Sequence, residues 1–85
     1  MSTKNLYLIE ISGPVGYDSY NQAIVCTTSA RKAKNIHPNG EKYGDPGWNS
    51  YSWVSDPELV YATCIGKAAH NVVVDSVLCA SFNAG

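Results

Sequence analysis

The chain has 85 residues, of which 45% are hydrophobic and 15% charged, and its net charge at pH 7 is −1. This is the composition of a globular protein rather than a disordered segment, and we expect a single compact domain over residues 1–85. The near-neutral charge disfavours general nucleic-acid binding, and no apolar run approaches the roughly 20 residues that a membrane-spanning helix needs.

Short apolar runs bounded by turn residues predict the first half of the fold. Residues 5–12 (NLYLIEIS) are rich in β-branched side chains, and residues 22–28 (QAIVCTT) predict the second strand of a hairpin with a long turn between them. Ser29 then has the character of a helix N-cap. The helix it opens covers residues 30–37 (ARKAKNIH), because Pro38 disfavours helical backbone at the residue before it.

Two further strands are predicted after a long connection. Residues 38–53, which we call the aromatic loop, carry tyrosines and tryptophans but no apolar periodicity, and the strands that follow cover 59–66 and 72–82. The element order β-β-α-β-β predicts an α+β fold with a four-stranded, mainly antiparallel sheet and one short helix.

The predicted strands are apolar on both alternating sets of residues. An antiparallel sheet with one wet face alternates apolar and polar side chains, so the second face needs a cover that one short helix does not supply. The cover is either the aromatic loop or a second protein surface, including a homodimer. For the loop, we expect Trp53 and Tyr51 to anchor it while Tyr43 and Trp48 face outward; a wholly structural lid is the alternative.

The sequence contains no motif that predicts catalysis. Neither histidine has a partner arrangement typical of an active site; His37 is expected to cap the end of the helix and His70 to be solvated. The cysteines at 26, 64 and 79 have no C-x-x-C spacing, so we expect no metal site. Since the N-terminal residues lack the apolar stretch of a signal peptide, these cysteines are interpreted as buried free thiols of a cytoplasmic protein. We expect no catalytic residues and no cofactor.

Basic residues gather beside the aromatic loop. Arg31 and Lys32 occupy the first turn of the predicted helix, where the helix dipole disfavours cations, and Lys34 and Lys42 continue the cluster. A departure from local preference is typical of functional sites; the alternative is a solvated helix face balanced by nearby acids. The predicted partner-binding residues are Arg31, Lys32, Lys34, Lys42, Tyr43, Trp48 and Tyr51.

The segments YDSYNQAIVCTTSARKAKNIHP, IGKA and LCASFNAG, together with the tryptophan at 53, resemble small tailed-bacteriophage proteins of unassigned function. The resemblance implies a phage protein in the host cytoplasm that inhibits a host defence system, in the manner of anti-CRISPR proteins, by occupying a host protein surface. An oligomer that sequesters a nucleotide immune signal is the alternative. The resemblance assigns no catalytic residue.

Overall fold

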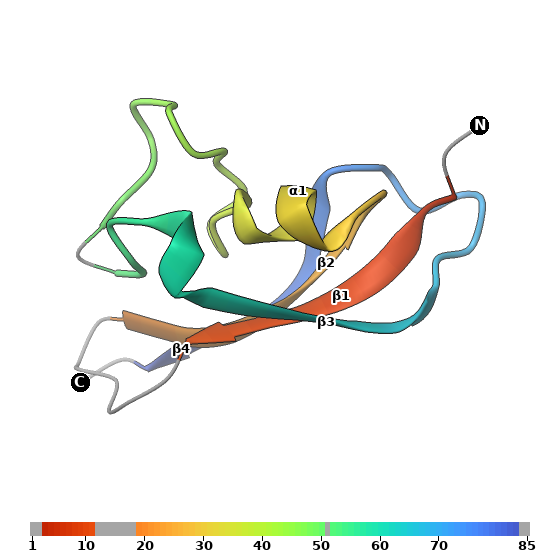
Figure 1. Cartoon of the computed structure of the whole chain (residues 1–85), viewed down its shortest axis with the longest axis horizontal. Helices are drawn as coiled ribbons and strands as arrows, with labels where there is room; N and C mark the ends of the chain where they lie inside the picture. The colour runs from red at the N-terminus through yellow and green to blue at the C-terminus, as the bar shows by residue number, and fades with distance from the viewer. Residues whose placement is uncertain (1–2, 12–18, 51, 84–85) are drawn as a thin grey trace.

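The computed structural model describes residues 3–11, 19–50 and 52–83. Its elements in chain order are the strands β1 (Asn5–Ile11) and β2 (Ser19–Thr27), the helix α1 (Ala30–Lys34), the 3₁₀ turn η1 (Pro57–Leu59), and the strands β3 (Val60–Lys67) and β4 (Ser76–Asn83). The strands form one antiparallel sheet in the order β3-β1-β2-β4 (Figure 1). The predicted α+β fold with a four-stranded antiparallel sheet and one short helix is confirmed.

The helix is shorter than predicted, because residues after Lys34 find other backbone partners. Ser29 caps α1 as expected, its Oγ accepting from the Lys32 amide at 3.2 Å. Ile36 forms an isolated β-bridge with Lys42 instead of extending the helix. The His37 amide donates to the Glu41 carbonyl at 2.7 Å and so belongs to a tight turn over residues 37–41 instead of the helix.

The last strand begins four residues later than predicted, at Ser76 rather than at residue 72. Asp75 has a φ of 60°, a left-handed conformation that a strand does not tolerate. Its amide donates to the Cys26 carbonyl at 2.7 Å, and Thr27 Oγ1 donates to its carboxylate at 2.7 Å. The Lys4 ammonium fixes the same connection by donating to the carbonyls of His70 and Val72, each at 2.6 Å.

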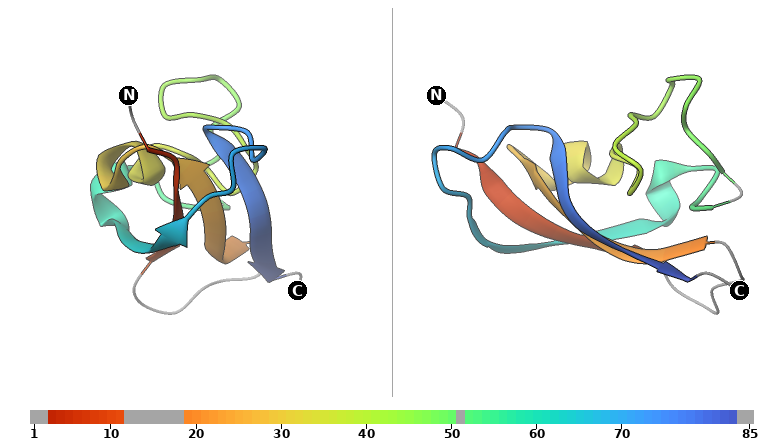
Figure 2. Two further views of the ribbon diagram at one scale, coloured as in Figure 1. Left: turned by 90° about the vertical axis from the view of Figure 1, so that its right-hand side faces the viewer. Right: turned by 180° about the vertical axis from the view of Figure 1, so that it is seen from behind.

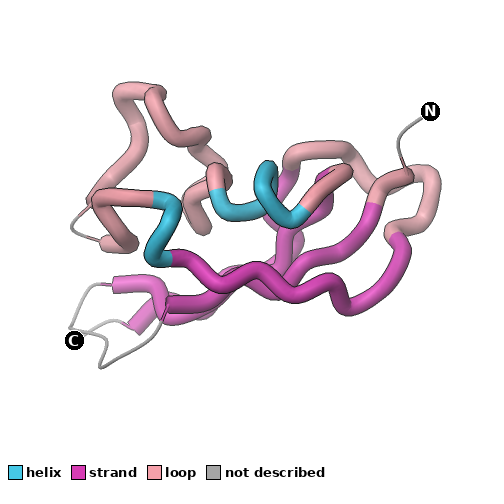
Figure 3. The backbone as a smooth tube through the Cα atoms, in the orientation of Figure 1, coloured by secondary structure: helices cyan, strands magenta, loops and turns pink. Residues whose placement is uncertain are grey.

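The hydrophobic core lies on one side of the sheet. In Figures 1 and 2, α1, η1 and the described residues between them lie on the same side of the strands, and Figure 3 shows how much of this layer is loop. Side chains of β1 and β2 pack against this layer, among them Ile9 and Val25, each 0% exposed. The buried cluster comprises Tyr7, Ile9, Ala23, Val25, Ala33, Ile36, Trp53, Val54 and Val60.

The described residues of the aromatic loop therefore lie with the helix on one face of the sheet and do not cover the second, so of the two alternatives for its cover the loop is excluded for these residues. Register places Leu8, Ile24 and Tyr61 on the uncovered face. The apolar residues of this face are partly buried (Leu6, Leu8 and Ile24), buried (Cys26) or exposed (Tyr61 and Cys79). Polar side chains lie among them on the same face: Glu10, Gln22, Thr63 and Ser81. This mixture lowers the cost of leaving the face in water.

Candidate functional site

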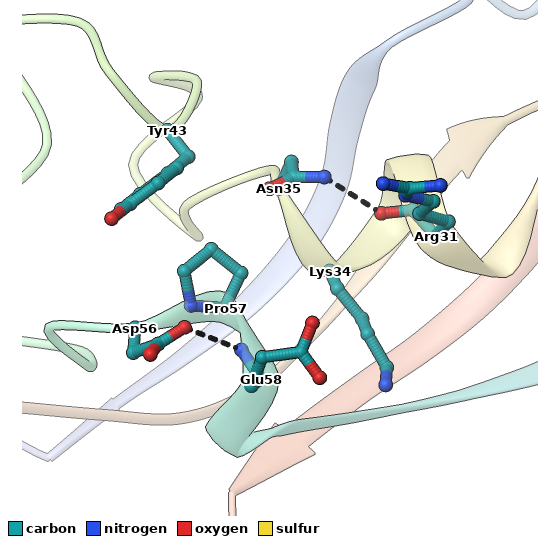
Figure 4. A pocket seen from close by; sticks show the side chains of 7 residues that line it. All are labelled: Arg31, Lys34, Asn35, Tyr43, Asp56, Pro57 and Glu58. Atoms are coloured by element: carbon teal, nitrogen blue, oxygen red, sulfur yellow. Dashed lines mark hydrogen bonds between the residues drawn. The ribbon is translucent and has the colours of Figure 1, made fainter.

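A pocket of about 160 Å³ lies where α1, the aromatic loop and η1 meet, and we call it the α1–η1 pocket. Arg31, Lys34 and Tyr43, three of the predicted partner-binding residues, line it together. Figure 4 shows the Tyr43 and Pro57 rings near one another, with Arg31 and Lys34 across the pocket from Tyr43. Its complete lining is Arg31, Lys34, Asn35, Tyr43, Asp56, Pro57 and Glu58.

The helical side of the pocket is held by one buried alanine. Ala33 is 0% exposed and packs in the core, so neighbouring positions of α1 project toward solvent. The Asn35 side-chain amide donates to the Arg31 carbonyl at 2.9 Å and closes the C-terminal end of the helix. The first turn of α1 contains no acidic residue, so its cations are not balanced within the helix itself.

The opposite wall is the turn η1, which begins with an N-cap followed by proline. Asp56 accepts from the Glu58 amide at 3.0 Å, and Pro57 occupies the first position of the turn, where its missing N–H costs nothing. Pro57 is buried, whereas Asp56 and Glu58 are exposed. Two carboxylates thus line the pocket with two cations, Arg31 and Lys34.

Tyr43 is the exposed aromatic residue of the pocket, at 53% exposure. Its amide donates to the Asn35 carbonyl at 2.9 Å. Its ring makes an edge-to-face contact with Trp48, with centroids 5.4 Å apart. Tyr43 therefore presents its ring to solvent from a backbone position that is already ordered.

The other predicted site residues do not line the pocket. Lys32 is exposed on α1 but lies outside the pocket lining. Lys42 Nζ donates to the Asp75 carbonyl at 3.2 Å and so supports the turn before β4. Trp48 was predicted to face outward, and this is wrong: it packs against the core, and its Nε1 donates to the Val54 carbonyl at 2.8 Å. Tyr51 lies outside the described residues.

Sequence reasoning missed the η1 wall of the pocket. The segment Asp-Pro-Glu at 56–58 has the pattern of an N-capped turn, and that signal predicts a turn but not which surface the turn faces. Trp53, by contrast, was predicted to anchor the aromatic loop, and it is 6% exposed within the core cluster.

His37, the residue before the aromatic loop, is buried against residues of that loop and does not cap the helix. Its ring is 0% exposed and makes edge contacts with Tyr20 and Trp48 at centroid distances of 5.7 and 5.1 Å. Nδ1 accepts from the Asn39 amide at 3.0 Å, and Nε2 lies 2.8 Å from the Asn49 carbonyl. Because the Asn39 amide is a donor, the proton of the neutral ring resides on Nε2. Burial lowers the pKa of His37 below its ordinary value of 6.5, against the opposing hydrogen bond to Asn49 and the charge of Glu41.

The three cysteines differ in their exposure to solvent. Cys26 is buried as predicted, but Cys64 and Cys79 are exposed because they lie on the two edge strands. No group of three or more His, Cys, Asp or Glu side chains that could hold a metal ion occurs in the described part of the chain. Within the same residues, no helix has the length and hydropathy to cross a bilayer.

Comparisons with protein families, curated proteins and solved structures found no match to this chain.

Proposed function

We propose that this chain is a small binding protein that acts by occupying a surface of another protein, with the α1–η1 pocket as its docking site. The observation that carries the proposal is the convergence of Arg31, Lys34 and Tyr43, from two separate segments, on one pocket whose far wall is η1. Tyrosine and arginine are the side chains most enriched among the energetically dominant residues of protein interfaces.

The size of the pocket favours a protein partner over a free small molecule. Its volume of about 160 Å³ is below the ~300–1,000 Å³ of typical ligand sites. A pocket of this size accommodates one protruding side chain of a partner, with the surrounding surface of α1 and η1 forming the rest of the contact.

The charges of the pocket also favour a protein partner over a free nucleotide. Arg31 and Lys34 face a wall that carries Asp56 and Glu58, so an approaching nucleotide would meet carboxylates as well as cations. A partner surface with charges of both signs complements this arrangement, and such complementarity supplies specificity. The alternative function, sequestration of a nucleotide signal, is disfavoured by these carboxylates.

The resemblance to small phage proteins supplies the biological setting of the proposal. In that setting the partner is a host protein of the cytoplasm, a component of a defence system, and the chain inhibits it by blocking its surface without a catalytic step.

The test is affinity capture from host lysate with tagged variants, quantified by mass spectrometry. The double variant Arg31→Glu/Lys34→Glu should weaken capture of the specific partner at least ~tenfold, as loss of interface hot spots does. Lys32→Glu is the control, since it reverses the same charge on the same helix outside the pocket lining, and it should weaken capture less than Arg31→Glu or Lys34→Glu does alone. Equal capture by the double variant and the wild type would remove the pocket from the interface.

Thermal shift with a panel of cyclic nucleotides tests the alternative. A protein-docking surface should give no change in melting temperature, whereas a nucleotide-dependent rise that Arg31→Glu abolishes would favour the sequestering function. The homodimer predicted from the uncovered sheet face is tested by light scattering of the purified chain, and it stays a prediction.

A further inference from the structure

The backbone of the aromatic loop is tied to the His37 ring by two hydrogen bonds of opposite direction. The Asn39 amide donates to Nδ1 at 3.0 Å, and Nε2 donates to the Asn49 carbonyl, 2.8 Å away. These bonds join the two ends of segment 39–50 through one side chain. The hydroxyl of Ser52, 3.3 Å from Nε2, also donates to the Asn49 carbonyl at 3.3 Å.

This arrangement requires a neutral ring. A second proton can add only at Nδ1, where the N–H it creates would point at the Asn39 N–H, so the acceptor of that bond is lost and two donors face each other. The cation would also lie in a site with no exposure to water, where an unpaired charge is costly.

The surroundings of the ring offer little to offset that charge. The charged group that stabilises a protonated His37 ring is the nearby Glu41 carboxylate, which is an exposed side chain. From β2 it meets the Tyr20 ring, and from the rest of the loop it meets the uncharged Trp48, Ser52 and Trp53.

From this geometry we propose that His37 is a pH-sensitive lock on segment 39–50: protonation of its Nδ1 breaks the Asn39 bond and releases the segment while the sheet stays folded. The lock reaches the pocket through a short chain of contacts. The His37 ring touches Trp48, Trp48 touches Tyr43, and Tyr43 lines the α1–η1 pocket. Acidification therefore removes one wall of the pocket. This consequence for partner docking rests on the function proposed above, whereas the lock itself does not.

The test uses the free, ¹⁵N-labelled protein, so it gives the same answer whatever the pocket binds. Ring-nitrogen shifts measured by NMR at pH 7.5 should show His37 with Nδ1 unprotonated and Nε2 protonated. On acidification its titration midpoint should lie below that of a model peptide histidine. A ring protonated on Nδ1, or a midpoint at or above 6.5, would overturn the proposal.

Hydrogen exchange then tests the release. The Tyr43 amide, bonded to the Asn35 carbonyl at 2.9 Å, should lose protection by a factor approaching tenfold between pH 7.5 and 5.5, since the released ring binds a proton with an ordinary pKa. At every pH it should be less protected than the Val25 amide of β2. Equal protection of the two amides would mean that the loop opens only when the whole protein unfolds, and the lock would be refuted.

Two variants complete the design. His37→Gln, which keeps a donor and an acceptor but does not titrate, should make Tyr43 protection independent of pH. His70→Gln removes the other histidine, which is exposed, and should behave as the wild type. A pH response that survives in folded His37→Gln would refute the proposal; should that variant not fold, the ring-nitrogen and exchange measurements on the wild type decide it.

Discussion

The two tryptophans of the aromatic loop provide a sharp test of how this small core is stabilised. Trp53 is the more buried, at 6% exposure, yet its Nε1 has no hydrogen-bond acceptor among the described residues. Trp48 is only partly buried, but its Nε1 donates to the Val54 carbonyl at 2.8 Å. We predict that replacement by phenylalanine destabilises the protein more at 48 than at 53, the reverse of the order expected from burial.

The magnitudes follow from what each substitution removes. Trp53→Phe loses buried ring carbons worth about 1–2 kcal/mol, but it also removes a buried unpaired donor whose burial costs about 1–3 kcal/mol. The net change should lie within about 1 kcal/mol of zero. Trp48→Phe removes the hydrogen bond from Nε1 to the Val54 carbonyl. Val54 is only 8% exposed, so its carbonyl loses a partner in a buried position, and the substitution should lower the free energy of unfolding by about 1–3 kcal/mol.

Urea unfolding followed by far-UV circular dichroism measures both variants without relying on tryptophan fluorescence. At equal slopes, the midpoint should fall clearly for Trp48→Phe and little for Trp53→Phe. Trp53→Ala is the control for the anchoring role and should cost about 3–5 kcal/mol. A larger loss for Trp53→Phe than for Trp48→Phe would refute the reasoning, and an unchanged midpoint for Trp53→Ala would show that Trp53 anchors nothing.

Three further predictions concern single contacts. Ser29→Ala removes the cap on the Lys32 amide and should lower the free energy of unfolding by about 1 kcal/mol, while Ser29→Asp should keep most of it. Thr27→Val removes the bond from Oγ1 to Asp75 and should cost about 1–3 kcal/mol in the same urea assay; stability equal to wild type would show that the turn before β4 does not depend on it. Because burial lowers the pKa of His37, the unfolded chain binds a proton that the folded chain excludes. The contribution of His37 to stability should therefore be fully present well above pH 6.5 and fall as the pH drops below it, by up to about 1.4 kcal/mol per pH unit, until the folded-state pKa is reached. In His37→Gln that part of the decline should disappear.

Local patterns in the sequence were sufficient for the secondary-structure class. The short apolar runs at 5–12 and 59–66, each next to turn residues, predicted strands that the structure contains as β1 and β3. The Ser29 cap could also be predicted, since its hydrogen bond reaches only three residues along the chain. Trp53 was predicted to anchor the aromatic loop and is buried in the core, whereas Trp48 was predicted to face outward and also packs against the core.

The long-range choices were not readable from these patterns. The sequence did not show that the aromatic loop would pack on the same side of the sheet as α1, because apolar residues on both faces of a strand do not identify which face a distant segment covers. It also did not place Asp56, Pro57 and Glu58 opposite Arg31 and Lys34, since a turn signal carries no information on what the turn faces. Sequence alone determined the presence of the strands and the start of the helix, which depend on neighbours within a few residues. The tertiary structure decided the site and the role of His37, because the bonds of His37 to Asn49 and Ser52 and the approach of η1 to α1 join segments 12 or more residues apart and depend on how the whole chain packs.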